Sequence, residues 1–129
     1  MEKLFNEMFD TAKTLLVKNE DIIDMMNHSL VIAMIVSESG KIYYGMNVSW
    51  WHSVCAEPTA VSNAFQAGER KFKYLMAVKL VRSTRKFEVI SPCGICREMF
   101  KQLNMDDLQV VLKTNNKYKI KTIGELLEY

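Results

Sequence analysis

The chain lacks several features that mark special classes of protein. No apolar run among its 129 residues approaches the length that crosses a membrane. The formal net charge is only +2, and the basic residues are scattered rather than gathered in a block of like charge. These absences argue against a transmembrane protein, a nucleic-acid arm and a membrane-surface segment, so we expect neither nucleic acid nor membrane as a partner.

A secretory signal is also missing, because charged side chains interrupt the first apolar positions: Glu2, Lys3, Glu7 and Asp10. We therefore expect a cytoplasmic protein. No repeat, linker or low-complexity segment divides the sequence, and its length suffices for one hydrophobic core without disulfide staples. The prediction is a single domain spanning residues 1–129.

Cysteine is scarce, and its number is odd. The chain has three, at Cys55, Cys93 and Cys96. An odd number of cysteines in a cytoplasmic chain argues against a disulfide framework. Metal or redox chemistry is the better explanation for them.

Hydrophobic periodicity predicts a mixture of helices and strands. Apolar residues recur at helical spacing from Leu4 to Leu16, which predicts a first helix. Short apolar or alternating runs predict five strands, with turns at 37–41 and 115–116. The predicted strands are residues 30–36, 42–48, 74–80, 108–112 and 118–120.

Start and stop signals predict three further helices. Pro58 is tolerable only in a first turn, so one helix should begin near Cys55 or Ala56 and stop at Gly68. Another should begin with Ser91 as N-cap and Pro92 as its first residue. Residues 122–125 carry a capping-box pattern for a final short helix. The order α-β-β-α-β-α-β-β-α predicts an α/β protein with helices packed on a mixed sheet.

The cysteines of this prediction lie at helix starts, with Cys55 on one helix and the C-x-x-C pair Cys93 and Cys96 on another. Free N–H groups at a helix N-terminus stabilise thiolates and lower the cysteine pKa. Three thiolates form a tetrahedral zinc site with one open position, which is typical of catalytic zinc. Glu57, two residues after Cys55, is placed to handle the proton of a water at that position.

Other interpretations of the same residues stay open. A C-x-x-C pair is also found in redox proteins, and a lone cysteine is commonly a packed core residue. Glu57 alone is typical of a solvated helix surface. A structural zinc site needs a fourth ligand, and neither His28 nor His52 has convincing ligand spacing.

Taken together, "CAE" at 55–57 and "PCGICR" at 92–97 resemble the cytidine deaminase superfamily. "GKIYYGMNV" at 40–48 is similar to the hairpin of that family, and "TIGELLEY" at 122–129 is similar to its C-terminal ending. The resemblance implies a cytidine deaminase-like three-layer sandwich, in which a mixed five-stranded sheet has helices on both faces. It also implies one Zn²⁺ per subunit, pyrimidine salvage and a homotetramer with active sites near subunit boundaries.

The resemblance implies roles for individual residues. The metal ligands would be Cys55, Cys93 and Cys96, and Glu57 would be the catalytic proton shuttle in hydrolytic deamination of a cytosine ring. The remaining implied roles are substrate binding by Asn47 and Ser49 at the sugar, by the Ala56 N–H and the Ser91 carbonyl at the pyrimidine, and charge balancing of the thiolates by Arg97.

The sugar-reading segment departs from the family pattern Asn-x-Glu, because it reads Asn47-Val48-Ser49. Loss of the carboxylate removes a hydrogen bond worth roughly 1.5–3 kcal/mol to a ribose hydroxyl. This departure, and Pro58 in place of a second arginine, resemble the blasticidin S deaminase branch. Its substrate is a cytosine nucleoside with an anionic sugar. Arg82, Arg85 and Lys86 could meet that anionic group, although solvated surface charges are the better explanation for them.

The sequence supports one main hypothesis about function and two alternatives. The main hypothesis is a zinc-dependent aminohydrolase acting on cytidine, deoxycytidine or a blasticidin S-like nucleoside. The alternatives are a non-catalytic protein that keeps the fold with a structural zinc, and a nucleic-acid editor, which the weak basic balance disfavours. Trp50 and Trp51 are expected either in a core or subunit interface or at the mouth of the pocket, with His52 beside them.

Overall fold

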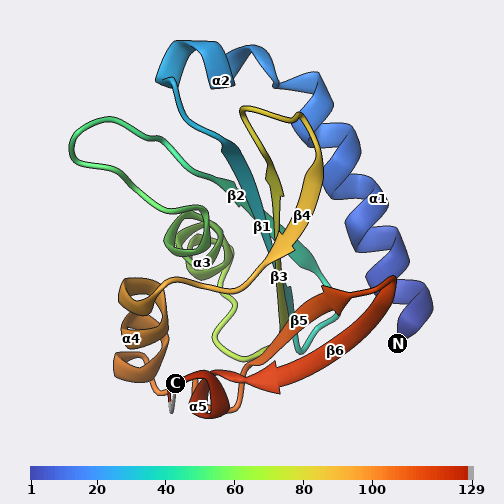
Figure 1. Ribbon diagram of the computed structural model, residues 1–129. Helices are drawn as coiled ribbons and strands as arrows, with labels where there is room; N and C mark the ends of the chain where they lie inside the picture. Colours follow the sequence, from blue (N-terminus) through green and yellow to red (C-terminus); the bar gives the residue numbers. More distant parts are fainter. Residues whose placement is uncertain (128–129) are drawn as a thin grey trace.

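The computed structural model describes residues 1–127 and forms three layers, with helices on both faces of one sheet (Figure 1). The last two residues lie outside the described part. They include Tyr129, which the sequence suggests either as a free chain end or as a residue that closes the site of a neighbouring subunit. The helices are α1 (Glu2–Lys18), α2 (Asp21–Met26), α3 (Ala56–Gln66), α4 (Gly94–Gln102) and α5 (Ile123–Leu126). The strands are β1 (Leu30–Ser37), β2 (Ile42–Met46), β3 (Phe72–Leu80), β4 (Phe87–Ile90), β5 (Gln109–Thr114) and β6 (Lys117–Thr122).

The sheet is mixed, as predicted. Its strands follow the order β2-β1-β3-β5-β6, and the short strand β4 pairs with β3 off this path. Neighbouring strands are antiparallel except β3 and β5, which run parallel. The five strands on the main path are the five that the sequence predicts, and the α/β class is confirmed.

Alternation along β1 divides the hydrophobic core between the two faces of the sheet. Ile32 and Met34 face the layer of α1 and α2, whereas Ala33 and Ile35 face the layer of α3, α4 and α5. The face toward α3 is rich in small side chains, so that helix lies close to the strands. This close packing brings the N-terminus of α3 to one end of the sheet.

Gly45 on β2 is the point of closest approach. A Cβ atom at this position would lie 2.6 Å from the Ala56 carbonyl oxygen and closer still to the Ala60 nitrogen. Only glycine therefore lets α3 rest on β2 at this depth. Because Cys55 and Glu57 lie in the first turn of α3, this contact also sets their position.

Local signals placed several ends correctly. Helix α3 begins at Ala56, so Pro58 lies in its first turn, and Gly68 follows the helix with φ +92°. The capping box of α5 is present between Thr122 and Glu125. These elements confirm the start and stop signals read from the sequence.

Two short elements were not predicted, and one strand ends early. The predictions missed α2 and β4, which have six and four residues and depend on tertiary contacts rather than on a long periodic pattern. Strand β2 ends at Met46 rather than Val48. The Val31 N–H of β1 donates to the side-chain oxygen of Asn47 at 2.8 Å, and this bond replaces a backbone bond between the two strands. Among residues 1–127, no helix has both the length and the apolar character needed to cross a membrane.

Candidate active site

Three cysteines from two helix starts converge on one point. Cys55 is the N-cap of α3, Cys93 is the N-cap of α4, and Cys96 is the third residue of α4. Their sulfur atoms all lie within 4.8 Å of one another. Neither His28 nor His52 belongs to this group in the described part of the chain. Three thiols and no fourth protein ligand fit a zinc ion with an open coordination position.

The start of α4 differs from the prediction. Ser91 is not its N-cap and Pro92 is not its first residue, because the helix begins at Gly94 with Cys93 as N-cap. The Arg97 N–H donates to the Cys93 carbonyl at 2.9 Å, which is the first hydrogen bond of the helix. Ser91 and Pro92 instead form an extended connection from β4, and this connection reaches the cysteines.

The thiols differ in their ease of ionisation. Partial burial raises the pKa of Cys93, but the backbone N–H groups of Cys96 and Ile95 outweigh it, so the net pKa is lowered. Burial raises the pKa of Cys55 and of Cys96. The expected lowering at a helix N-terminus therefore holds for Cys93 and is wrong for the other two. A divalent cation bound by all three thiols would deprotonate them, so this donor set fits zinc.

Glu57 lies beside the thiols and is almost fully buried, with 4% of its surface exposed. Burial raises the pKa of its carboxyl group, and its own backbone N–H only partly opposes this. Its charge in turn contributes to the raised pKa of Cys96. This burial contradicts the interpretation of Glu57 as a solvated residue on the helix surface. A buried carboxyl group with a raised pKa, next to three thiols, is a suitable proton acceptor and donor.

A cavity of 180 Å³ opens beside this cluster. Its lining contains the four residues that the family resemblance assigns to substrate binding, together with Cys55, Cys93 and Glu57. Sequence reasoning missed its remaining walls, and the only signal for them was adjacency to the motifs. The predicted substrate residues are Asn47, Ser49, Ala56 and Ser91, and the missed wall residues are Val31, Ser53, Val54 and Ile90.

The cavity wall formed by Asn47 and Ser49 has a fixed hydrogen-bond polarity. Because the Val31 N–H donates to Asn47 Oδ1 at 2.8 Å, the Asn47 amide nitrogen must face the other way. That nitrogen donates to the Ser29 carbonyl at 3.1 Å and to Ser49 Oγ at 3.0 Å. Ser49 thus accepts from Asn47, which leaves its own hydroxyl proton for a ligand.

Arg97 makes its hydrogen bonds to oxygen atoms rather than to the thiols within the described residues. Its guanidinium donates to the Pro92 carbonyl at 2.7 Å, to Ser91 Oγ at 3.0 Å and to the Leu126 carbonyl at 3.2 Å. Among the described residues, the charge balancing expected of Arg97 therefore does not involve a hydrogen bond to a cysteine sulfur. The charge-balancing role of Arg97 stays a prediction.

The loop from Asn47 to Cys55 is a small hairpin with an exposed tip. Val48 and Val54 pair through two backbone hydrogen bonds of 3.0 and 2.9 Å. Beyond that pair, Trp50 is 45% exposed and Trp51 is 87% exposed, so neither packs in the core of its own chain. The Trp51 and His52 rings lie 4.1 Å apart between centroids.

The basic residues after β3 are engaged away from the cavity. Arg85 pairs with Asp24 of α2 at 3.4 Å, and Arg82 donates to the Asn27 side chain at 3.3 Å. Both are exposed. Attachment of the β3–β4 turn to α2 therefore accounts for these two arginines.

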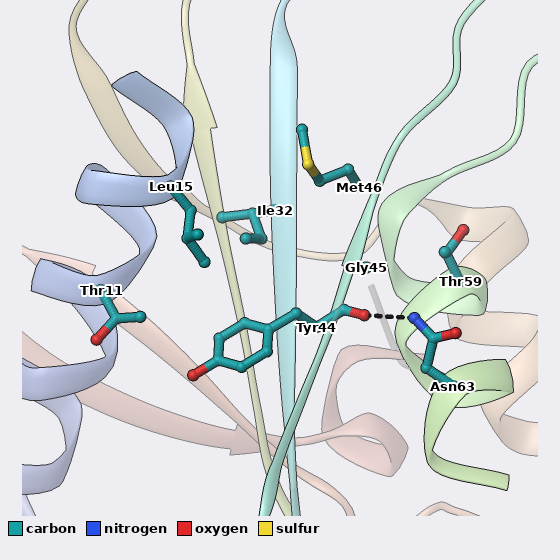
Figure 2. Close-up of a pocket in the computed structure, with 8 residues that line it drawn as sticks. All are labelled: Thr11, Leu15, Ile32, Tyr44, Gly45, Met46, Thr59 and Asn63. Carbon is teal, nitrogen blue, oxygen red and sulfur yellow. Dashed lines mark hydrogen bonds between the residues drawn. The ribbon is translucent and has the colours of Figure 1, made fainter. Parts of the chain in front are cut away.

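A wider groove of 630 Å³ lies between α1 and α3, across the edge strand β2 (Figure 2). Figure 2 shows the Asn63 amide donating to the Tyr44 carbonyl at its floor, a bond of 2.7 Å. Its lining is mostly apolar and holds none of the cysteines or carboxylates. The smaller cavity, where the thiols and Glu57 meet, is the one with reactive groups.

Comparison with known proteins agrees with this geometry. The profile of the family described as "Cytidine and deoxycytidylate deaminase zinc-binding region" matches residues 9–112. The chain belongs to this family. The match confirms the predicted zinc cofactor and the assignment to the deaminase hydrolases, because the described part of the chain supplies a suitable cluster of three thiols.

Individual relatives point to two branches of the family. The chain is 32% identical to blasticidin-S deaminase of Bacillus cereus over 107 residues, which cover 78% of this chain and 76% of that protein. It is 34% identical to cytidine deaminase of Sporosarcina psychrophila over 100 residues, covering 74% and 69%. Both relationships concern the same catalytic family.

Solved structures support the fold. The crystal structure of cytidine deaminase from Burkholderia pseudomallei matches with a TM-score of 0.63 and 29% identity, covering 78% of this chain and 80% of that one. The cytidine deaminase from Bacillus anthracis matches with a TM-score of 0.71 over 96% of this chain and 86% of that one. At 22% identity, the second match speaks for the fold alone.

Proposed function

We propose that this protein deaminates a cytosine-type nucleoside by zinc-dependent hydrolysis. The observation that carries the proposal is the meeting of three thiols and the buried Glu57 in one cavity. Water adds at C4 of the ring, the bond from C4 to the amino nitrogen breaks, and ammonia leaves the uracil product. The balance of atoms needs no reactant other than water and the nucleoside.

The residues of the cavity divide this reaction among them. Cys55, Cys93 and Cys96 would hold the zinc, which would supply Lewis acidity and lower the pKa of the attacking water. Glu57 accepts the proton of the attacking water and returns it to the leaving nitrogen. Its raised pKa suits both transfers, because a carboxyl group titrating closer to neutrality exchanges protons readily in both directions.

Two walls orient the ring and the sugar. The Ala56 N–H, at the N-terminus of α3, and the Ser91 carbonyl contact the pyrimidine edge, while Val31 and Ile90 supply apolar surface against its faces. Asn47 and Ser49 face the sugar. Arg97, four residues after Cys93, adds a positive charge near the thiolates.

Ser49 bears on which sugar the cavity accepts. Cytidine and deoxycytidine are one candidate class, and a cytosine nucleoside with an anionic sugar, as in blasticidin S, is the other. Ser49 favours the second class, because its hydroxyl can donate a hydrogen bond to an anionic sugar, whereas a carboxylate at this position would repel that sugar. The similarity to both branches keeps both substrates in the proposal.

We also infer a single-domain cytoplasmic enzyme of pyrimidine salvage that works as a homotetramer with active sites near subunit boundaries. Exposed apolar side chains on the loop after β2 and at the start of α4 support the assembly, since surfaces of this kind commonly mark protein interfaces. They are Val48, Trp50, Trp51, Val54 and Ile95. Sedimentation equilibrium tests it: four chains per particle support the tetramer, and a monomer contradicts it.

A non-catalytic protein with a structural zinc is the competing function. Glu57 argues against it, because burying a carboxyl group costs free energy that a purely structural site gains nothing from. The decisive experiment follows the loss of absorbance with cytidine, deoxycytidine and blasticidin S, with the Glu57→Ala variant as the blank. Deamination of at least one substrate by the wild-type protein alone supports the proposal, and equal rates in both proteins contradict it.

A further inference from the structure

Arg97 connects three segments that are separate along the chain. Its side chain leaves the first turn of α4 and is partly buried. Nε donates to the Pro92 carbonyl at 2.7 Å, Nη2 to Ser91 Oγ at 3.0 Å and Nη1 to the Leu126 carbonyl at 3.2 Å. The last acceptor belongs to α5, which lies beside α4 in Figure 1.

We propose that Arg97 is a positioning residue that holds the Ser91–Pro92 segment against α5 and thereby fixes Ser91 in the wall of the cavity. This inference rests on the proposed function. It gives Arg97 a role through Ser91, in addition to the positive charge that it adds near the thiolates.

The Ser91–Pro92 segment needs such an anchor. It lies between the end of β4 at Ile90 and the start of α4 at Gly94, outside both regular elements. Pro92 has no N–H of its own to bond. Arg97 binds the Pro92 carbonyl and the Ser91 hydroxyl together, which fixes the direction in which Ser91 faces the cavity.

The anchor also depends on α5. Leu126 is the last residue of that helix, where carbonyl groups have no partner within the helix. Arg97 satisfies this carbonyl across 29 positions of sequence. Through Arg97, the position of α5 therefore affects the position of Ser91, which lines the cavity close to Cys93.

Only arginine can make this connection. The planar guanidinium directs five N–H donors along fixed directions, whereas a lysine ammonium is a single point of charge. A lysine at position 97 keeps the positive charge but cannot reach three acceptors that lie in different directions. The substitution therefore separates positioning from charge balancing.

The test compares Arg97→Lys, Ser91→Ala and the double variant, with Arg70→Lys as a matched control. Arg70 also donates to two backbone carbonyls, those of Phe65 and Glu69, at 3.0 and 2.8 Å, but lies away from the cavity. We expect Arg97→Lys to keep its zinc and to raise KM about tenfold, with a smaller change in kcat. The double variant should show less than the product of the two single effects, and Arg70→Lys should keep the wild-type KM.

Hydrogen exchange gives a readout that does not depend on turnover. Arg97→Lys should speed exchange in residues 89–96 and in residues 123–127 together, even if none of the tested nucleosides is a substrate, so failure of the proposed function remains distinguishable. A wild-type KM with unchanged exchange in Arg97→Lys would overturn the inference. So would faster exchange throughout the chain, which would indicate general destabilisation, or fully multiplicative effects in the double variant.

Discussion

The two halves of the cavity are built by different means. The thiol half consists of the N-caps and first turns of two helices, so helical backbone holds its residues, and Glu57 and Cys96 are buried in it. The sugar-facing half consists of the loop after β2, which is held by the side chain of Asn47 and ends in an exposed tip. In the proposed function, the first half performs the chemistry and the second half selects the substrate.

With these two roles, a change of substrate requires a change only in the second half, and the reaction itself is kept. A change in the thiol half alters the metal ligands or the proton carrier. A change in the sugar-facing half, such as serine in place of the family carboxylate at position 49, alters only what the cavity accepts. The predictions below attack one half at a time.

For changes in the sugar-facing half, the largest expected effect is on substrate choice. Ser49→Glu places a carboxylate within reach of Asn47 and of a ribose hydroxyl, a hydrogen bond worth roughly 1.5–3 kcal/mol. We expect kcat/KM for cytidine to rise relative to blasticidin S by about 10- to 100-fold, measured on both substrates. Ser49→Ala is the matched control without a carboxylate, and an unchanged ratio in Ser49→Glu would contradict the assignment of the sugar-facing wall.

The thiol half should respond to a change beneath it. Gly45→Ala adds a methyl group against the backbone of Ala56 and Ala60, so α3 must shift away from β2. We expect a loss of about 1–3 kcal/mol in unfolding free energy and weaker zinc retention, because Cys55 moves with the helix. Urea unfolding and zinc titration measure both.

Gly124→Ala is the control for this change, since a Cβ there would meet neighbours only at ordinary contact distance, 3.5 Å or more. Wild-type stability in Gly45→Ala would show that α3 does not depend on this close approach.

Much of the thiol half was predictable, because helix caps, proline position and cysteine spacing are local signals. The start of α4 was not, since Ser91 and Pro92 resemble a helix start but are bound instead by Arg97. The walls from Val31 and Ile90 depend on how distant strands align. The short elements α2 and β4 carry too few residues for a periodic pattern, so their contacts could not be read from the sequence.

The smallest predicted effect lies far from both halves. Glu69 accepts hydrogen bonds from the hydroxyl groups of Ser39, Tyr43 and Ser37, and the first two in particular lower the pKa of its carboxyl group. A lowered carboxyl pKa stabilises the fold above the ordinary carboxyl range, and this contribution is lost as the pH falls through the lowered value.

Glu69→Gln should therefore be less stable than the wild type at pH 7, and the difference should shrink as the pH falls below about 4. Thermal unfolding at several pH values measures this difference. A gap between the two proteins that stays constant across the acid range would contradict the role of the Glu69 carboxylate.

The account depends most directly on the three thiols and Glu57 forming one zinc site. Zinc per chain, measured by mass spectrometry of metals alongside the deamination rate, tests this in the wild type, Cys96→Ser and Glu57→Gln. We predict one zinc per chain in the wild type and in Glu57→Gln, a rate at least about 100-fold lower in Glu57→Gln, and loss of both zinc and activity in Cys96→Ser. A wild-type protein without zinc, or a Glu57→Gln variant that keeps its rate, would contradict the account.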